Sequence, residues 1–264
     1  CHYFVFMISA ILNIGRIKNY DALIISSPTL FTGVIGIFVK KFYGKDYWLD
    51  LRDLWPDSAL ELEQINKGRL FRFGKILEAK IYENAKGFIF PVPSFRRYLS
   101  KFSNEVSKKP MIDLMNGVSR KFINEAKIHN KSYKNKFTVL YSGNMGLAQD
   151  LKTIIKTAKI LTDYDIYFDF IGEGVCKSEI RDLAKDYKVK VLIHDSKPRK
   201  ELIKSIMESS VCLVPLKNKK LFNFALPSKM FEYMACGKPV IVGIDGDAKE
   251  IVKSSKSGIC VQPE

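Results

Sequence analysis

The sequence predicts an α/β protein made of two doubly wound units, each built on a parallel sheet. Three observations support this prediction. Short runs rich in β-branched residues alternate with longer amphipathic stretches along the chain, as expected of strands joined by helices. The strand-like runs are continuously apolar, which is typical of strands buried on both faces of a parallel sheet. A polar, basic segment at 119–136 separates two such series.

The first series contains four expected strands, at residues 22–26, 47–52, 87–92 and 111–115. Helices are expected over 32–42 and 69–85. In the second of these, apolar residues recur at helical spacing, namely Leu70, Phe73, Leu77 and Ile81. The pair Asn116-Gly117 is a turn signal that closes the series.

The second series contains six expected strands, at residues 137–142, 167–172, 189–194, 211–215, 239–242 and 258–261. Five helices are expected beside them, at 151–161, 177–187, 199–208, 229–235 and 249–254. We therefore predict a first domain over 1–118, a linker over 119–135 and a second domain over 136–264.

Composition excludes several classes of protein. Of the 264 residues, 47% are hydrophobic, which is enough for one or two cores and argues against global disorder. The longest apolar run, at 3–12, is about half the length of a membrane helix and lacks the basic start of a signal peptide. The cysteines are scattered without a CxxC pair, which argues against a disulfide scaffold or a structural zinc site and fits a reducing, cytoplasmic compartment; they are Cys1, Cys176, Cys212, Cys236 and Cys260.

The formal net charge is +15, from 43 basic and 28 acidic side chains. Such an excess indicates nucleic acid, an anionic membrane surface or a phosphorylated substrate. No RNA-binding aromatic motif accompanies the charge, so we place nucleic acid last. A lysine-rich solvated surface is the plain alternative.

The stretch Tyr141-Ser142-Gly143-Asn144-Met145-Gly146 follows the first expected strand of the second domain. Its glycines allow the backbone to approach a ligand, and a helix start after such a loop attracts anions. A second stretch, Ile171-Gly172-Glu173-Gly174, also ends a strand and is followed by Lys177. Either stretch by itself is equally compatible with a tight turn between strand and helix.

A third stretch, at 226–241, is more informative. Pro227 and Ser228 predict a helix start that Ser228 caps. Lys229 falls in the first turn, where the helix dipole disfavours a cation, so its position indicates an anion such as a diphosphate. Glu232 lies three residues further on, on nearly the same face, where its carboxylate can accept hydrogen bonds from ribose hydroxyls. The alternative is that Lys229 and Glu232 form an ordinary surface pair.

Residues 227–241, Pro-Ser-Lys-Met-Phe-Glu-Tyr-Met-Ala-Cys-Gly-Lys-Pro-Val-Ile, closely resemble the donor-binding segment of GT-B glycosyltransferases of family 4. The likeness is greatest to the bacterial branch that builds surface polysaccharides such as O-antigen, lipopolysaccharide and capsule. Five further segments resemble the same family in order: Ser27-Pro28-Thr29-Leu30, Asp50-Leu51-Arg52-Asp53-Leu54-Trp55-Pro56, Asn116-Gly117-Val118, Ser142-Gly143-Asn144-Met145-Gly146 and Ile171-Gly172-Glu173-Gly174.

The resemblance implies a GT-B fold of two Rossmann-like domains, with 1–118 as part of the acceptor-side domain and 136–264 as the donor domain. The chain starts at Cys1 inside an apolar run and ends at Glu264 just after an expected strand. Two complete domains with a closing helix need about 350 residues. We therefore expect a fragment truncated at both ends.

On the donor side, Glu232 matches the second glutamate of the family's paired motif, which holds the donor ribose. The first glutamate of that pair would fall at Phe224, so its contact is absent or replaced. The first loop also lacks the Arg and Lys that many members place on the diphosphate. The candidates that remain are Lys229 and Lys177, with the backbone N–H groups of 143–146 and 228–230.

On the acceptor side, Arg52-Asp53 stands where many relatives carry a histidine in the cleft between the domains. We expect Asp53 to orient or deprotonate the acceptor hydroxyl and Arg52 to bind a phosphate. The alternative is an Arg52–Asp53 ion pair that fixes a loop.

The activity implied by the resemblance is retaining transfer of a hexosyl or N-acetylhexosaminyl group from a nucleotide-diphosphate sugar, with UDP favoured and no cofactor or metal. The implied acceptor is a lipid-linked saccharide at the inner face of the plasma membrane. Basic residues on the helix expected at 69–85 fit an anionic membrane surface. An ordinary helix with one face in the core and a basic face in solvent explains them equally well. These residues are Arg69, Arg72, Lys75 and Lys80. A nucleotide-sugar 2-epimerase and a non-catalytic GT-B subunit stay open as alternatives.

Overall fold

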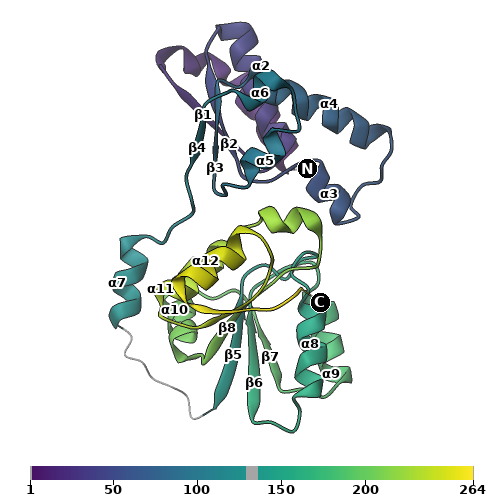
Figure 1. Ribbon diagram of the computed structural model, residues 1–264, viewed down its shortest axis with the longest axis vertical. Helices are drawn as coiled ribbons and strands as arrows, with labels where there is room; N and C mark the ends of the chain where they lie inside the picture. Colours follow the sequence, from purple (N-terminus) through teal and green to yellow (C-terminus); the bar gives the residue numbers. More distant parts are fainter. Residues whose placement is uncertain (1, 129–135, 264) are drawn as a thin grey trace. The chain divides into compact units, whose positions relative to one another are not determined.

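The computed structural model describes residues 2–128 and 136–263, which fall into two compact units, Cys1–Met115 and Asn116–Glu264 (Figure 1). Each unit holds a parallel sheet with helices around it, as the sequence predicts. In the described ranges, no helix has the length and apolar character needed to cross a membrane.

Unit 1 contains a four-stranded sheet in the order β1-β2-β3-β4, with every neighbouring pair parallel. Its strands are β1 (Leu23–Ser27), β2 (Tyr47–Leu51), β3 (Gly87–Phe90) and β4 (Met111–Asp113). Its helices are α1 (His2–Leu12), α2 (Leu30–Tyr43), α3 (Asp57–Glu61), α4 (Arg69–Asn84), α5 (Phe95–Leu99) and α6 (Asn104–Ser107), with a 3-10 turn η1 (Ile14–Asn19).

The core of unit 1 forms where α2 and α4 lie against the central strands. Leu49 and Phe88, on neighbouring strands, are fully buried. Tyr47 is also fully buried, and its hydroxyl donates to the carbonyl of Ile81 on α4 over 2.8 Å. A Cβ at Gly36 would lie 2.5 Å from the Tyr47 ring, so only glycine lets α2 approach β2 this closely.

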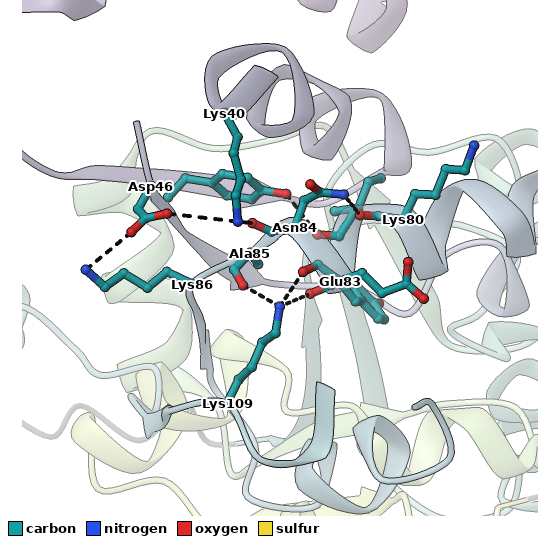
Figure 2. Close-up of polar contacts among 11 residues, drawn as sticks. Lys40, Asp46, Lys80, Glu83, Asn84, Ala85, Lys86 and Lys109 are labelled. Carbon is teal, nitrogen blue, oxygen red and sulfur yellow. Dashed lines mark hydrogen bonds and ion pairs between the residues drawn. The ribbon is translucent and has the colours of Figure 1, made fainter. Parts of the chain in front are cut away.

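The end of α4 is closed by a lysine from a distant part of the chain (Figure 2). The Lys109 ammonium donates to the backbone carbonyls of Tyr82, Glu83 and Ala85 over 3.1, 2.5 and 2.7 Å. A cation beside the unpaired carbonyls at a helix C-terminus is favoured by the helix dipole. Lys40 adds a bond to the Asn84 carbonyl over 3.1 Å. These contacts tie the end of α4 to the segment before β4 and to α2.

The exposed side of α4 differs from the expected one. Leu70 and Phe73 were expected on an apolar stripe facing the core, yet their side chains are 69% and 62% exposed. The buried residues of the helix are Gly74, Glu78, Ile81 and Tyr82. Glu78 can be buried because Lys75 and Tyr98 pair with its carboxylate, and this pairing turns the helix away from the orientation that hydrophobic periodicity alone predicts.

Unit 2 contains a six-stranded parallel sheet in the order β10-β9-β8-β5-β6-β7. Its strands are β5 (Phe137–Ser142), β6 (Ile166–Ile171), β7 (Val191–His194), β8 (Val211–Pro215), β9 (Val240–Gly243) and β10 (Gly258–Cys260). Its helices are α7 (Arg120–Ile128), α8 (Leu151–Ile160), α9 (Lys177–Asp186), α10 (Arg199–Glu208), α11 (Ser228–Ala235) and α12 (Asp247–Ser255), with a 3-10 turn η2 (Lys220–Phe224).

The segment expected as a linker at 119–135 is not wholly a linker. Residues 120–128 form α7, on which Phe122 and Ala126 are buried. The Arg199 guanidinium lies 5.1 Å from the Phe122 ring centroid and donates to Ser119 Oγ over 2.9 Å. This stretch belongs to unit 2, because its few apolar side chains pack on α10 and α11. Residues 129–135 lie outside the described part.

Candidate functional site

The order of strands in unit 2 places a topological switch point at the carboxyl ends of the two central strands of the sheet. The chain runs from β5 to β6 and β7 on one side, then crosses to β8, β9 and β10 on the other. In doubly wound sheets, ligands bind beyond the carboxyl ends of the strands where this reversal occurs. The reversal lies between β5 and β8. The loop that begins at Gly143 follows β5, and α11 with Lys229 comes after β8.

The first loop, residues 143–146, and the second, residues 172–174, pack on each other. Gly143 N–H donates to the Ile171 carbonyl over 2.9 Å, and Met145 N–H donates to the Glu173 carbonyl over 2.6 Å. A Cβ at Gly172 would lie 1.9 Å from the Gly143 oxygen, and one at Gly174 would lie 2.3 Å from the Met145 oxygen. The glycines of the second loop are therefore required by the first loop, with no need to invoke a ligand.

This packing corrects part of the expectation for the first loop. Gly143 N–H donates to the end of β6, Met145 N–H donates to the second loop, and Gly146 N–H donates to Gln149 Oε1 over 3.0 Å. Only the Asn144 N–H of this loop has no hydrogen-bond partner among the described residues. The phosphate-binding donors expected at 143–146 thus reduce to one.

Helix α11 begins one residue earlier than predicted. Pro227 is its N-cap and makes no side-chain capping bond, while Ser228 is its first helical residue and is exposed. The expected cap by Ser228 was therefore wrong, because proline at 227 already supplies the extended backbone that precedes a helix. Within the described ranges, the N–H groups of Ser228 and Lys229 make no hydrogen bond, so both stay available to an anion, whereas the third expected donor, Met230 N–H, donates to the Pro227 carbonyl over 3.1 Å.

Lys229 is half-buried in the first turn of α11, as predicted. Its ammonium nitrogen lies 3.9 Å from the centroid of the Tyr141 ring. It also lies 2.9 Å from where a Cβ would stand on Gly143, so the missing side chain of that glycine makes room for it. Burial lowers the pKa of Lys229 to about 7, and the charge of Glu232 only partly opposes this shift. No carboxylate pairs with this ammonium in the described part of the chain.

Glu232 lies one turn further along α11 and is also half-buried. Burial raises the pKa of its carboxyl group, and the charges of Arg199 and Lys229 partly lower it again. The next residue, Tyr233, was not singled out from the sequence. Its buried hydroxyl accepts the Ser142 N–H over 2.7 Å and lies 2.9 Å from Ser142 Oγ. Tyr233 therefore fixes the end of β5 against α11 and sets the position of the first loop beside Lys229.

Lys177 stands at the start of α9 and was expected to meet the diphosphate. Its ammonium instead pairs with Glu173 Oε1 over 2.7 Å and with Asp195 Oδ1 over 2.5 Å. These two hydrogen bonds raise its pKa. A lysine whose charge is already met by two carboxylates is a poor choice for a diphosphate, and the sequence did not reveal Asp195 as its partner.

In unit 1, Arg52 and Asp53 follow β2. They do not form the ion pair with each other that was the alternative expectation. Arg52 Nε lies 2.8 Å from Asp50 Oδ2. Asp53 accepts the Leu54 N–H over 2.8 Å and the Ser58 hydroxyl over 3.2 Å. Burial raises the pKa of Asp53, and these two hydrogen bonds partly oppose it. Asp53 therefore holds the turn that leads into α3.

A large apolar cavity in unit 2 lies away from these residues. It measures about 740 Å³ and is lined mainly by α8 and by strands β5, β8 and β9. Its lining includes neither the first loop nor Lys229 or Glu232. Because the first loop follows β5 and Lys229 follows β8, we place the candidate site at the switch point between these two strands and not in the apolar cavity. Within the described residues, no cluster of three or more His, Cys, Asp or Glu side chains is arranged to hold a metal ion.

Two Rossmann-like units, each with a parallel sheet, match the GT-B fold of solved glycosyltransferase structures. The chain belongs to the family described as glycosyl transferases group 1, whose pattern matches residues 122–264. Among curated relatives it is 23% identical over 133 residues to WcaI of Escherichia coli (strain K12), a glycosyl transferase assigned to colanic acid biosynthesis. That match covers 49% of this chain and 33% of WcaI.

Solved structures share the fold at low sequence identity. A sucrose-phosphate synthase from Thermosynechococcus elongatus superposes with a TM-score of 0.76 at 18% identity, covering 99% of this chain and 66% of that one. Anabaena Alr3699/HepE in complex with UDP-glucose gives 0.70 at 13% identity, covering 96% and 68%. The lipopolysaccharide outer core galactosyltransferase WaaB gives 0.63 at 13% identity, covering 98% and 68%. The chain thus spans a third of the curated relative and about two thirds of these structures.

Proposed function

We propose that unit 2 binds the diphosphate of a nucleotide-sugar donor, with UDP as the favoured nucleotide, in a retaining glycosyltransferase. The transferred group is a hexosyl or N-acetylhexosaminyl residue, and the acceptor is a lipid-linked saccharide of cell-surface polysaccharide synthesis. HepE is known in complex with UDP and with UDP-glucose, which supports the donor class. The polysaccharide roles in the names of WcaI and WaaB support the acceptor class.

The observation that carries this proposal is the ammonium of Lys229. Lys229 is buried beside Tyr141 and has no carboxylate partner in the described part of the chain, so its charged form is unfavourable in the free protein. The N–H groups of Ser228 and Lys229 stand next to it at the helix start. Such an arrangement becomes favourable once a doubly charged group sits there, because helix N-termini and ammonium groups both attract anions.

The same arrangement suits the chemistry of glycosyl transfer. When the bond from sugar to diphosphate breaks, negative charge grows on the leaving diphosphate. Pre-oriented N–H groups and an ammonium stabilise that charge, and the loss of one such donor costs about 10²–10³ in rate. The carboxylate of Glu232 then accepts hydrogen bonds from the ribose hydroxyls. In unit 1 we assign Asp53, whose carboxyl pKa is raised by burial, to the acceptor hydroxyl and Arg52 to an acceptor phosphate.

A calorimetric titration with UDP, UDP-glucose and UMP tests the donor assignment. We expect UDP and UDP-glucose to bind and UMP to bind more weakly, because UMP lacks the second phosphate that faces Lys229. If none of the three binds, the site assignment fails and a non-catalytic subunit is favoured. Epimerisation or hydrolysis of the donor without any acceptor would favour a nucleotide-sugar 2-epimerase.

A second titration separates the role of Glu232 from that of Lys229. Glu232→Ala should lower UDP affinity by about tenfold while leaving the affinity for inorganic diphosphate unchanged, because the carboxylate contacts the ribose. In a transfer assay followed by the mass of a lipid-linked acceptor, turnover should fall by at least about tenfold. Glu250→Ala on α12, an exposed carboxylate of the same unit, is the matched control. Equal loss of UDP and diphosphate affinity would refute the ribose role.

A further inference from the structure

Helix α4 carries an apolar stripe on its solvent side. Leu70, Phe73 and Ile76 are 69%, 62% and 58% exposed. They follow each other at intervals of three residues, so they form a continuous row along the first two turns of the helix. Scattered exposed apolar side chains are ordinary in proteins, but a contiguous row with an aromatic ring at its centre marks a contact surface.

Basic side chains lie in the same row. Arg69, Arg72 and Lys80 are exposed, and none of them forms an ion pair in the described part of the chain. At about 100° per residue, positions 69, 70, 72, 73, 76 and 80 fall within an arc of about 160°. We call this surface the α4 face; it comprises Arg69, Leu70, Arg72, Phe73, Ile76 and Lys80.

The charges sit where the helix itself disfavours them. The first turn of α4 contains no acidic residue, yet Arg69 opens the helix and Arg72 follows one turn later. Cations near a helix N-terminus are opposed by the helix dipole unless an anion lies close by. The position of these two guanidinium groups therefore indicates an anionic partner.

The other side of α4 is fixed, so the α4 face is not a loosely attached core face. Glu78 is fully buried, and its carboxylate accepts the Tyr98 hydroxyl over 2.7 Å. Lys75 Nζ lies 2.9 Å from Asp57 Oδ2 and also pairs with Glu78. A Cβ at Gly74 would come within 3.1 Å of Pro56, so α4 and the turn before α3 are in close contact. Rotating the α4 face inward would break this buried polar cluster.

We propose that the α4 face docks on the surface of an anionic phospholipid bilayer. Phe73, Leu70 and Ile76 enter the boundary between headgroups and acyl chains, while Arg69, Arg72 and Lys80 contact lipid phosphates. Helices that combine an apolar row with basic residues lie in the plane of the membrane interface in this way. Docking brings unit 1 to the location of a lipid-linked acceptor, and to that extent the inference rests on the proposed function.

The chemistry of the α4 face favours lipid over other partners. A nucleic acid would use the arginines but would leave the aliphatic side chains of Leu70 and Ile76 uncovered in water. A protein interface tolerates arginine but is depleted in lysine, whereas the α4 face places Lys80 in line with its apolar side chains. A bilayer surface supplies both a phosphate layer and an apolar layer within the length of one side chain.

Vesicle flotation of the whole chain tests the proposal. Vesicles of phosphatidylcholine alone are compared with vesicles that also contain phosphatidylglycerol. We expect the chain to float with the anionic vesicles only and to be released by added salt. The pair Arg69→Gln and Arg72→Gln should lower the partition coefficient about twenty-fivefold, at about fivefold for each basic side chain. The pair Phe73→Ser and Ile76→Ser should lower it by at least about tenfold.

A matched control comes from α8 in unit 2, where Ile160 is 78% exposed and Lys156 is also exposed. The pair Lys156→Gln and Ile160→Ser should leave flotation unchanged. All these substitutions are at exposed positions, and the circular dichroism spectrum should stay that of the wild-type chain. Flotation by the two α4 pairs equal to that of the wild type would overturn the proposal. Absence of flotation by the wild-type chain would also overturn it and would point to a protein partner.

The outcome is independent of donor binding. A chain that binds UDP but does not float refutes the membrane inference and leaves the proposed function standing. A chain that floats through the α4 face but binds no nucleotide refutes the proposed donor site and leaves the membrane inference standing. The α4 variants should bind UDP with wild-type affinity in the absence of vesicles, because they alter no residue of unit 2.

Discussion

The ammonium of Lys229 lies 3.9 Å from the centroid of the Tyr141 ring, at the start of a helix that faces the end of β5. A cation over an aromatic face is stabilised by the negative face of the ring, more strongly where water is excluded. The ring therefore lets Lys229 remain at the helix start without a carboxylate partner. This leaves its charge available for a ligand, which distinguishes it from Lys177 and its two carboxylates.

UDP affinity should fall as the pH rises. Burial lowers the pKa of Lys229 to about 7 in the free protein, so the ammonium loses its proton above that pH. A bound diphosphate favours the charged form and raises this pKa, and binding above about pH 7.5 therefore takes up a proton. UDP itself changes little there, because a terminal phosphate with a pKa of about 6 is already ionised.

Calorimetry between about pH 7.5 and 9, in buffers of different ionisation enthalpy, measures both effects. The affinity should decrease by up to about tenfold per pH unit, with proton uptake approaching one. Lys229→Met should show weak binding, a flat pH profile and no uptake. A flat profile in the wild-type chain would contradict a titrating lysine at the diphosphate.

The contact between the two loops predicts an unusual sensitivity at Gly172. Gly172 has φ 149°, and a Cβ there would lie 1.9 Å from the Gly143 oxygen. Gly237 also has positive φ, at 64°, but nothing lies within 4 Å of its Cβ position. Urea unfolding should show a loss of about 1 kcal/mol for Gly237→Ala and about 3 kcal/mol or more for Gly172→Ala. Equal losses would show that only backbone strain, and not the contact between the loops, limits this position.

Lys177→Ala should change UDP affinity by less than about threefold, because pairing with Glu173 and Asp195 leaves little of its charge for a ligand. The measurement is the same UDP titration, with the Lys177 variant compared with the wild-type chain. A tenfold loss would restore Lys177 to the diphosphate site that the sequence suggested.

The closure of α4 by Lys109 should matter for the stability of unit 1. Lys109→Met removes an ammonium that meets three backbone carbonyls (Figure 2). The free energy of unfolding should fall by about 1–2 kcal/mol, since both hydrogen bonds and the favourable helix dipole are lost. Lys108→Met, its exposed neighbour, should have little effect. Tryptophan fluorescence during urea unfolding reports on this unit, because Trp48 and Trp55 both lie in it.

The strands of both sheets were predicted well from the sequence, because strands buried in a parallel sheet consist of continuous apolar runs such as 137–142 and 211–215. It also placed Lys229 correctly in the first turn of α11. Local sequence carries this information, since the signals of a strand or a helix start span only a few residues.

Contacts between distant residues could not be predicted in this way. Asp195 is one of the two carboxylate partners of Lys177, and the acceptors of the Gly143 and Met145 N–H groups are Ile171 and Glu173. Each of these pairs forms only after neighbouring strands have been placed side by side. The orientation of α4 was mispredicted for a similar reason, because periodicity does not show that Glu78 is buried and paired with Lys75.

The most direct test of the central claim is a UDP titration of Lys229→Ala beside Lys253→Ala, an exposed lysine on α12 of the same unit. If Lys229 is the cation that meets the donor diphosphate, its removal should lower UDP affinity by at least about tenfold. Removal of Lys253 should leave the affinity at its wild-type value. Wild-type UDP affinity in Lys229→Ala would contradict the assignment of this site.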